Sequence, residues 1–434
     1  MSLVFGSVDA TIGLKKKMMQ LRETNSCFSD KLRGFIFALT ILETPAFFAV
    51  YAITGRTYAG SESSSAYVIY MIFMLAMQVF FLVRKRTIKR TEFRWLLIPL
   101  LFVGLAWIFA VINHQSLNTS IIRNAILWQY TGILLAINTN SYHLEEEIRH
   151  ALVILMFVIT LGSVVSVLLP FLRGMSIYSI AGYSLTGNSF QTQSYFIALS
   201  AGINLLFFSS SKKNTAVKIV SYVLLGIQFV CSILYAGRGG MILASAYVVV
   251  FYFISTRKSG NVKNKLMMIV VYIAVFIILF LALEYLVNSS PILKQRFGRI
   301  FSYIGEGGID LSQTSNRDIL YSRALGHIAH SPLFGYGILG YEYLDGLNRY
   351  PHNIVLEMLI EGGIVYLLLW AFVIISGYRK MKYFRNTISY ELYLIAFMFS
   401  IIKLMFSSSY SYEMLFWFSI AFAHICNREE VHTE

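Results

Sequence analysis

The chain has 434 residues, of which 57% are hydrophobic and only 13% are charged, against roughly 25% charged residues in a soluble domain. Its mean hydropathy is +0.64, and apolar runs of about 18 to 25 residues recur, each long enough to span a bilayer as a helix. These values exclude a soluble globular protein. The runs are continuously apolar instead of alternating, which also excludes a β-barrel. We therefore predict an all-α, polytopic helical membrane protein.

The first predicted element is a polar, basic segment, residues 1–33, which we expect to be cytoplasmic. Transmembrane helices 1–9 follow within residues 34–287, and three more lie within residues 353–426, before a cytoplasmic tail at 427–434. Hydropathy predicts about twelve spans in total: 34–54, 65–83, 95–113, 121–138, 150–170, 194–210, 216–236, 239–256, 265–287, 353–378, 390–406 and 412–426.

The positions of Lys and Arg predict the orientation of these spans, because cytoplasmic loops are enriched in both residues. The basic loops are 84–94, 212–218, 257–265 and 379–385. With these loops inside, both termini are cytoplasmic. The net charge of +14 is thus divided among separate short loops. This distribution argues against a nucleic-acid partner and favours contact with anionic lipid head groups.

The sequence predicts neither a metal site nor a cofactor. The three cysteines, Cys27, Cys231 and Cys426, include no outside pair, and His327 with His330 is the closest approach to a metal-ligand spacing. Motifs for nucleotide binding or a serine nucleophile are absent.

Two predicted outside segments are longer than simple connections, residues 171–193 and residues 288–352, and loops of this size commonly carry function. The second contains a predicted amphipathic helix that starts near Ser315 and ends near His330, before Ser331-Pro332. We expect this helix to lie on the membrane surface or to cap a cavity. Its apolar positions are Ile319, Leu320, Ala324, Leu325 and Ile328.

The same loop ends at Tyr350-Pro351-His352-Asn353, where a titratable side chain lies beside the bilayer within reach of water. Glu357 and Glu361 follow Asn353 at helical spacing, so they share one helix face below His352. We expect these carboxylates to orient Arg or His side chains or to pair with Lys403. Structural pairing is the alternative, favoured for Glu361, and for His352 the alternative is that it caps the helix.

Several elements of this region resemble bacterial O-antigen polymerases and O-antigen ligases. The resemblance rests on ordered motifs within residues 288–370: 317–325, 331–337, 351–353, Glu357 and 361–363. Members of this superfamily are integral membrane glycosyltransferases that use polyprenyl-diphosphate-linked sugars outside the inner membrane. For this chain the resemblance implies the same fold class and the same substrates.

Transfer from a lipid diphosphate requires cations for the leaving group and a base for the acceptor hydroxyl. His352 is the predicted catalytic base, because its ordinary pKa suits proton transfer near neutral pH, and Asn353 and Glu357 are predicted supporting residues. Arginine suits the diphosphate since it stays charged and binds phosphate with two donors. The candidates are Arg238, in a five-residue turn whose glycines would let a phosphate approach, Arg317, Arg173, Arg296 and Arg323.

We therefore predict a metal-independent polysaccharide polymerase of the bacterial inner membrane, with its active side facing the periplasm or outside. The Tyr-, Phe- and Ile-rich composition favours this assignment over the alternative, a ligase that transfers finished polymer to lipid A–core. A multi-span transporter or flippase is a third hypothesis, although no internal repeat supports it. The predicted partners are lipid-linked donor and acceptor glycans, membrane lipid, a flippase and a chain-length regulator.

Overall fold

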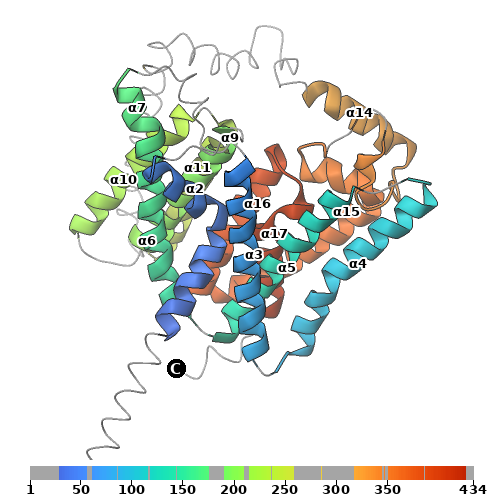
Figure 1. The fold of residues 1–434 in the computed structure, drawn as a ribbon, viewed down its shortest axis with the longest axis horizontal. Coiled ribbons are helices and arrows are strands. Elements are labelled where there is room, and N and C mark those ends of the chain that lie inside the picture. Colours follow the sequence, from blue (N-terminus) through green and yellow to red (C-terminus); the bar gives the residue numbers. More distant parts are fainter. Residues whose placement is uncertain are drawn as a thin grey trace, which may run out of the picture.

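The structure is a computed structural model. It describes residues 29–55, 61–85, 87–115, 118–142, 144–174, 190–209, 215–235, 237–258, 285, 317–344, 347, 350–385 and 387–426. All regular structure within these ranges is helical, with no strand. The predicted all-α class is therefore confirmed (Figure 1).

The helices follow one another along the chain as long, mostly antiparallel segments. Their bounds are Ser29–Ile41, α2 (Glu43–Ile53), α3 (Ser61–Arg84), α4 (Arg90–Ile112), α5 (Thr119–Tyr142), α6 (Glu145–Ser163), α7 (Leu169–Leu172), α9 (Phe190–Ile203), α10 (Thr215–Leu234), α11 (Arg238–Lys258), α14 (Arg317–His330), α15 (Ile354–Met381), α16 (Ile388–Phe406) and α17 (Met414–Ile425). Short π-helical turns, Val164–Leu168 and Asn204–Ser209, continue α6 and α9.

Seven helices in the described ranges are long and apolar enough to cross a membrane, or eight if one bent pair is counted as a single span. The chain is thus a polytopic helical membrane protein, but the predicted count of about twelve is not reached. The predicted span 265–287 lies outside the described residues except for residue 285. Three other predicted spans are shorter helices or parts of helices: 14 residues in α9, 12 in α17, and the apolar stretch Gly239–Tyr252 of α11.

The first predicted span, 34–54, is broken. Helix Ser29–Ile41 and α2 meet at an angle of 90° at Leu42. Pro45 explains the break, because proline has no N–H to donate to the carbonyl of Ile41 and its ring would clash with that carbonyl in a continuous helix. The same residue is tolerated within the first turn of a new helix, where N–H groups have no helical partner. Glu43 and Thr44 are consequently placed at a helix start inside the bundle.

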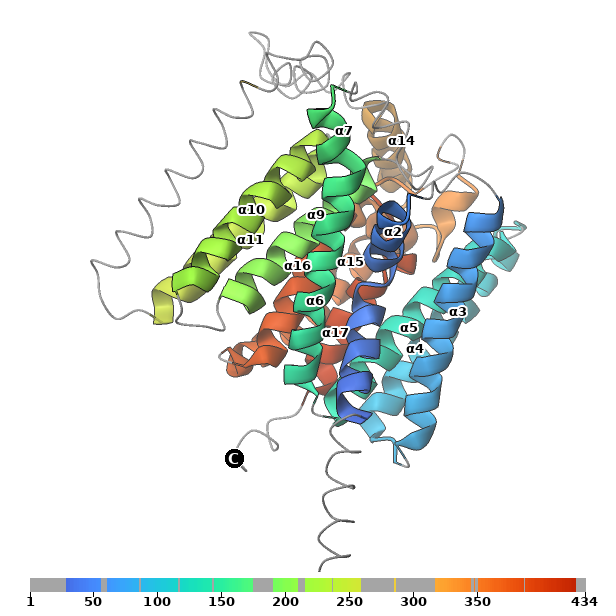
Figure 2. The ribbon, with the colours of Figure 1, turned by 60° about the vertical axis from the view of Figure 1, so that its left-hand side comes forward.

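Helix α17 forms the centre of the core, where almost every side chain is buried. It packs closely on α5, and Gly132 permits this approach, since a Cβ there would lie 2.5 Å from the carbonyl oxygen of Met414. Helices α3 and α4 lie at one edge of the bundle in Figure 2, and α4 exposes large apolar side chains such as Leu100, Leu101 and Val111. These surfaces suit contact with lipid tails.

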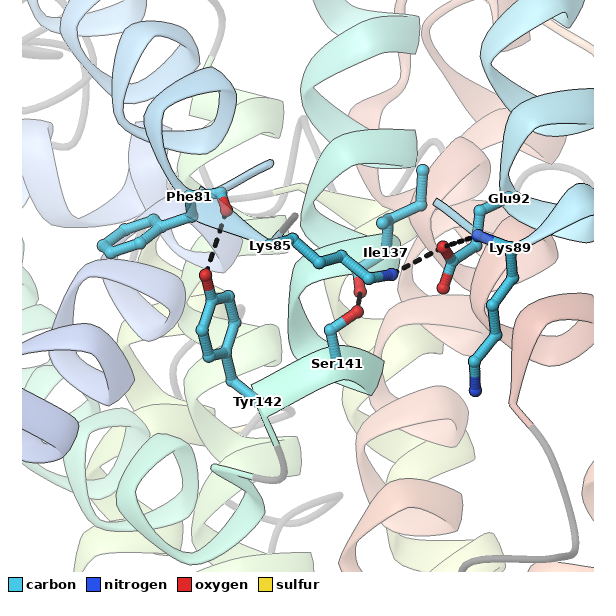
Figure 3. Close-up of polar contacts among 7 residues, drawn as sticks. All are labelled: Phe81, Lys85, Lys89, Glu92, Ile137, Ser141 and Tyr142. Carbon is cyan, nitrogen blue, oxygen red and sulfur yellow. Dashed lines mark hydrogen bonds and ion pairs between the residues drawn. The ribbon is translucent and has the colours of Figure 1, made fainter. Parts of the chain in front are cut away.

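The turn between α3 and α4 is held by Glu92, whose side chain is fully buried. One carboxylate oxygen accepts hydrogen bonds from Lys85 Nζ at 2.5 Å and from the backbone N–H of Lys89 at 2.9 Å (Figure 3). Close by, the Tyr142 hydroxyl donates to the carbonyl oxygen of Phe81 at 3.0 Å, which joins α5 to α3. The predicted basic loop is therefore a compact, ion-paired turn.

Candidate active site

The predicted site residues that the structure describes gather at one end of the bundle. Figure 2 shows α7 and α14 at this end, and the α3–α4 turn and the end of α17 at the opposite end. The α10–α11 turn also lies beside α7, because the Tyr235 hydroxyl is 2.7 Å from that of Ser166 in the preceding π-helical turn. Three of the candidate arginines lie at helix ends: Arg173 directly after α7, Arg238 at the first position of α11 and Arg317 at the first position of α14.

Helix α14 confirms the predicted loop helix and ends at His330, as expected. Its buried side is formed by Leu320, Ala324 and Ile328, which pack against the core. Ile319 and Leu325 were predicted on the same apolar stripe, but they are exposed. The buried residues are four positions apart and therefore lie on one face of the helix. Ile319 and Leu325 are each one position away from a buried residue, so they are turned away from that face.

The segment after α14 inserts its backbone into a break in α15. At Gly362 and Gly363 the helix leaves helical geometry, which frees carbonyl and N–H groups that a membrane helix must satisfy internally. The carbonyl oxygens of Ile360 and Glu361 accept from the N–H groups of Tyr336 and Gly337 at 2.8 and 2.7 Å. In return, the N–H groups of Ile364 and Val365 donate to Pro332 and Leu333 at 2.9 and 3.4 Å.

Two glycines make this exchange sterically possible. Gly335 and Gly363 both have φ of +62°, a region that L side chains rarely adopt. A Cβ on Gly335 would lie 2.4 Å from the carbonyl oxygen of Ile360, and a Cβ on Gly363 would lie 2.3 Å from the backbone of Leu333. The motifs at 331–337 and 361–363, separate in sequence, are thus one interlocked unit.

Asn353 caps α15, and His352 lies immediately outside the cap. Asn353 Oδ1 accepts hydrogen bonds from the backbone N–H groups of Val355 and Leu356 at 3.0 and 3.2 Å. The capping role considered for His352 is therefore filled by its neighbour. His352 itself has φ of +54°, an uncommon conformation for a residue with a side chain and one that occurs at functional sites. Its half-buried ring lies edge-on to that of Tyr350, 4.5 Å between centroids.

Residues 407–413 connect α16 to α17. This connection lies against Tyr350 and the start of α15. The ring of Tyr350 meets that of Tyr412 at 5.8 Å. Ser409 donates a short hydrogen bond to the buried carboxylate of Glu357 and lies 2.7 Å from the Ser411 hydroxyl. Glu357 therefore ties the start of α15, just below His352, to this connection.

Glu361 also holds the connection in place, and both of its oxygens are used. One accepts from the Tyr410 hydroxyl and the other from the N–H of Leu339 at 3.0 Å. This arrangement supports the structural interpretation of Glu361. The expected pairing of either α15 carboxylate with Lys403 is wrong, because Lys403 Nζ lies 2.6 Å from Glu413 in the same connection.

Tyr195 in α9 lies near Arg317, near Glu413 of the connection and near the start of α11. Both charged side chains are within electrostatic range of its hydroxyl. A Cβ on Gly239, the residue after Arg238, would lie 1.8 Å from that same hydroxyl. The structure therefore brings Arg317, Glu413 and the backbone beside Arg238 into one neighbourhood, centred on Tyr195.

The glycines around Arg238 do not leave open space for a phosphate as predicted. Gly237 and Gly240 face Ser194, whose atoms would lie 1.9 and 2.3 Å from a Cβ at these positions, and Gly239 faces Tyr195. Their function in the fold is to let the α10–α11 turn pack against α9. Arg238 is the first residue of α11.

The remaining predicted arginines are Arg173, Arg323 and Arg296. Arg173 follows α7 with an exposed side chain, and Arg323 is exposed on α14. Arg296 lies outside the described residues. Within the described ranges, no group of three or more His, Cys, Asp or Glu side chains could hold a metal ion.

Sequence reasoning missed the connection at 407–413, which was treated only as a boundary between two predicted spans. A signal was present: three consecutive serines followed by Tyr-Ser-Tyr-Glu form a polar run in a strongly apolar region, and Lys403 precedes this run by four positions. The connection was missed because it is only seven residues long, and the sequence criterion for a functional loop was its length.

Comparison with known protein families supports the resemblance. Residues 223–371 match the family model described as O-antigen ligase (Wzy_C). This segment extends from α10 to the middle of α15, so it contains Arg238, Arg317, His352 and both motifs of the interlocked unit, but it ends before the α16–α17 connection. A comparison with curated proteins gave no match.

Proposed function

We propose that the chain is a membrane glycosyltransferase that moves a glycan from a polyprenyl diphosphate onto a sugar hydroxyl. The observation that carries this proposal is the position of His352. It lies in a left-handed conformation at the start of α15, within a segment that matches the O-antigen ligase model. Arg317 and Arg238 belong to the same end of the bundle, where the lipid–water boundary would hold the diphosphate.

In the proposed reaction, the His352 ring accepts the proton of the acceptor hydroxyl as its oxygen attacks the anomeric carbon of the donor sugar. The new C–O bond forms while the bond to the diphosphate breaks, and the electron pair leaves with the polyprenyl diphosphate. Arg317 and Arg238 stabilise the charge that develops there. Guanidinium groups can supply this charge without a divalent ion, with Asn353 and Glu357 fixing the position of His352.

Polymerase and ligase activities share the donor and differ in the acceptor. We assign polymerisation, in which the acceptor is another lipid-linked repeat unit, because the sequence composition is typical of variable polysaccharide loci. The alternative is transfer of finished polymer to lipid A–core. Both reactions use the same residues, so the choice depends on the product alone.

We also propose the membrane arrangement that this reaction requires. The chain would cross the bacterial inner membrane about twelve times, with both termini cytoplasmic and α14 facing the periplasm or outside. The basic α3–α4 turn and α14 occupy opposite ends of the bundle, as this orientation demands. Anionic lipid, a flippase that supplies the donor and a chain-length regulator would be its partners.

The test is the pattern of surface glycan and lipid-linked intermediates in a host that lacks this gene, complemented with the wild type or with His352→Ala. For a polymerase, the variant should leave single repeats on the final acceptor and no ladder. Long polymer stranded on its lipid carrier, with a bare acceptor, would identify a ligase. A normal ladder with the variant, present in the membrane at wild-type amounts, would contradict the role of His352.

A further inference from the structure

A cavity of about 200 Å³ lies between the broken first span and the α16–α17 connection. It is large enough for about seven water molecules at their liquid volume, or for one polar ring of similar size. Its polar lining residues are Glu43, Thr44, Tyr67, Thr192, Lys403, Ser408, Tyr412 and Glu413. None of these residues belongs to the predicted catalytic set.

Glu43 is the unusual residue of this cavity. Its side chain is only 2% exposed, yet its Oε2 has no hydrogen-bond partner among the described residues. A buried carboxylate oxygen without a partner is costly. The 90° break at Leu42 places Glu43 at the start of α2, and broken helices within membranes commonly mark substrate sites.

The rest of the lining combines aromatic rings with groups that are already paired. Lys403 and Glu413 neutralise one another at 2.6 Å. The Thr44 and Tyr67 hydroxyls lie 2.8 Å apart and link α2 to α3. Trp128, Phe196 and Phe399 add apolar ring surface. One available carboxylate oxygen amid aromatic rings suits a ligand with apolar C–H faces and several hydroxyl donors.

A bare metal cation fits this lining poorly. Hard cations such as Ca²⁺ take six or more oxygen ligands. Of the cavity's two described carboxylates, Glu413 is held by Lys403. A sugar ring, by contrast, can donate a hydroxyl to Glu43 while its faces rest on Tyr67 or Trp128.

The cavity is connected to His352 through a short series of aromatic rings. Tyr412 lines the cavity and meets Tyr350 at 5.8 Å, and Tyr350 meets His352 at 4.5 Å. A glycan residue in the cavity would therefore be separated from His352 by the rings of Tyr412 and Tyr350.

We propose that this cavity binds one sugar residue of the glycan substrate, with Glu43 accepting a hydrogen bond from a ring hydroxyl. This inference rests on the proposed function, because it names the site where that reaction holds its saccharide. Glu43 is assigned a binding role and takes no part in proton transfer.

The test measures binding of the repeat-unit oligosaccharide, released by mild acid from the host's own surface glycan, to the full-length protein in detergent. Titration calorimetry would compare the wild type, Glu43→Gln and Glu92→Gln. The last variant is the matched control, since Glu92 is equally buried but lies at the opposite end of the bundle. Thermal unfolding would verify that each variant is folded.

We expect Glu43→Gln to weaken the affinity about two- to tenfold, the usual effect of losing one hydrogen bond, and Glu92→Gln to leave it unchanged. Trp128→Phe should remove a fluorescence change that accompanies binding in the wild type. Equal affinity of wild type and Glu43→Gln would overturn the proposal, as would a fluorescence change that persists without Trp128.

A parallel glycan ladder separates this proposal from the proposed function. A wild-type ladder together with equal binding by Glu43→Gln would refute the cavity assignment and leave glycosyl transfer in place. If the wild type itself produced no ladder and did not bind the oligosaccharide, the proposed function and the cavity assignment would both be refuted.

Discussion

His352 combines a strained backbone with a defined ring position, and this combination has a direct consequence for catalysis. With φ of +54° the residue adopts a conformation that costs energy, and its ring is oriented by Tyr350. His352→Gln should therefore slow glycan transfer by about 10²- to 10⁴-fold, the usual contribution of a general base. Donor affinity should remain, because the diphosphate is held by arginines.

The measurement is the rate of transfer by purified protein, alongside donor binding. His330→Gln is the matched control: His330 ends α14 at the same end of the bundle, is exposed, and lies with its Nδ1 2.7 Å from the carbonyl oxygen of Gly326. A comparable loss of rate in both variants would show that the effect is not specific to His352.

Arg317 and Arg323 lie on the same helix but in different surroundings. Arg317 is partly buried at the first position of α14, where N–H groups also favour anions, and its charge reaches Tyr195. Arg323 is exposed. We predict that Arg317→Ala weakens donor binding by about 1.5–3 kcal/mol, the scale of charge-assisted hydrogen bonds, and that Arg323→Ala has a clearly smaller effect. Equal losses would indicate a general charge effect of α14.

At the scale of residues, loop ends and lone arginines gave patterns that led us to His352, Asn353 and Arg317, whose roles in catalysis stay predictions. The sequence misjudged the glycines beside Arg238 and the partner of Lys403. Both errors have one cause: whether a glycine faces a ligand or a neighbouring helix, and which carboxylate lies opposite a lysine, depend on tertiary packing that local spacing does not contain.

The interlocked unit of α15 makes the strongest prediction at the scale of an element. Gly363→Ala places a Cβ 2.3 Å from the backbone of Leu333, at a φ that alanine rarely adopts. The four exchanged backbone hydrogen bonds would be displaced with it. We expect the free energy of unfolding to fall by at least about 1–3 kcal/mol, measured as a lower thermal midpoint in detergent.

Gly326→Ala supplies the control for this prediction. Gly326 lies within α14, and no atom approaches within 4 Å of a Cβ built there. Alanine is the better helix former, so stability should stay constant or rise by about 0.5–1 kcal/mol. A Gly363→Ala protein as stable as the wild type would mean that the backbone exchange contributes little.

Hydropathy predicted the long helices because membrane spans carry their signal in every residue. It could not predict the break at Gly362–Gly363 or the bend at Leu42. Pro45 and the Gly362–Gly363 pair permit these breaks, but the hydropathy of the surrounding residues stays high, so a span predicted from hydropathy runs through both places. The 407–413 connection was also missed, and its importance comes from what packs around it.

On the scale of the whole molecule, the two ends of the helix bundle differ in structure. The ion-paired α3–α4 turn occupies one end and α14 the other (Figure 2), and the positive-inside rule predicts that the α3–α4 turn faces the cytoplasm. Cysteines at two exposed positions, Thr87→Cys and Ser322→Cys, can test this orientation in a chain whose Cys27, Cys231 and Cys426 are replaced by serine.

A membrane-impermeant maleimide should label position 322 in right-side-out vesicles and position 87 only in inverted vesicles. The reason is physical: the two sites are separated by the length of the bundle, so a single leaflet cannot expose both. The reverse pattern would place α14 on the cytoplasmic side, away from lipid-linked glycan on the outer side of the membrane. The proposed transfer reaction would then lack its topological basis. Labelling of both positions in the same vesicles would mean that the α3–α4 turn and α14 do not lie on opposite sides of the membrane.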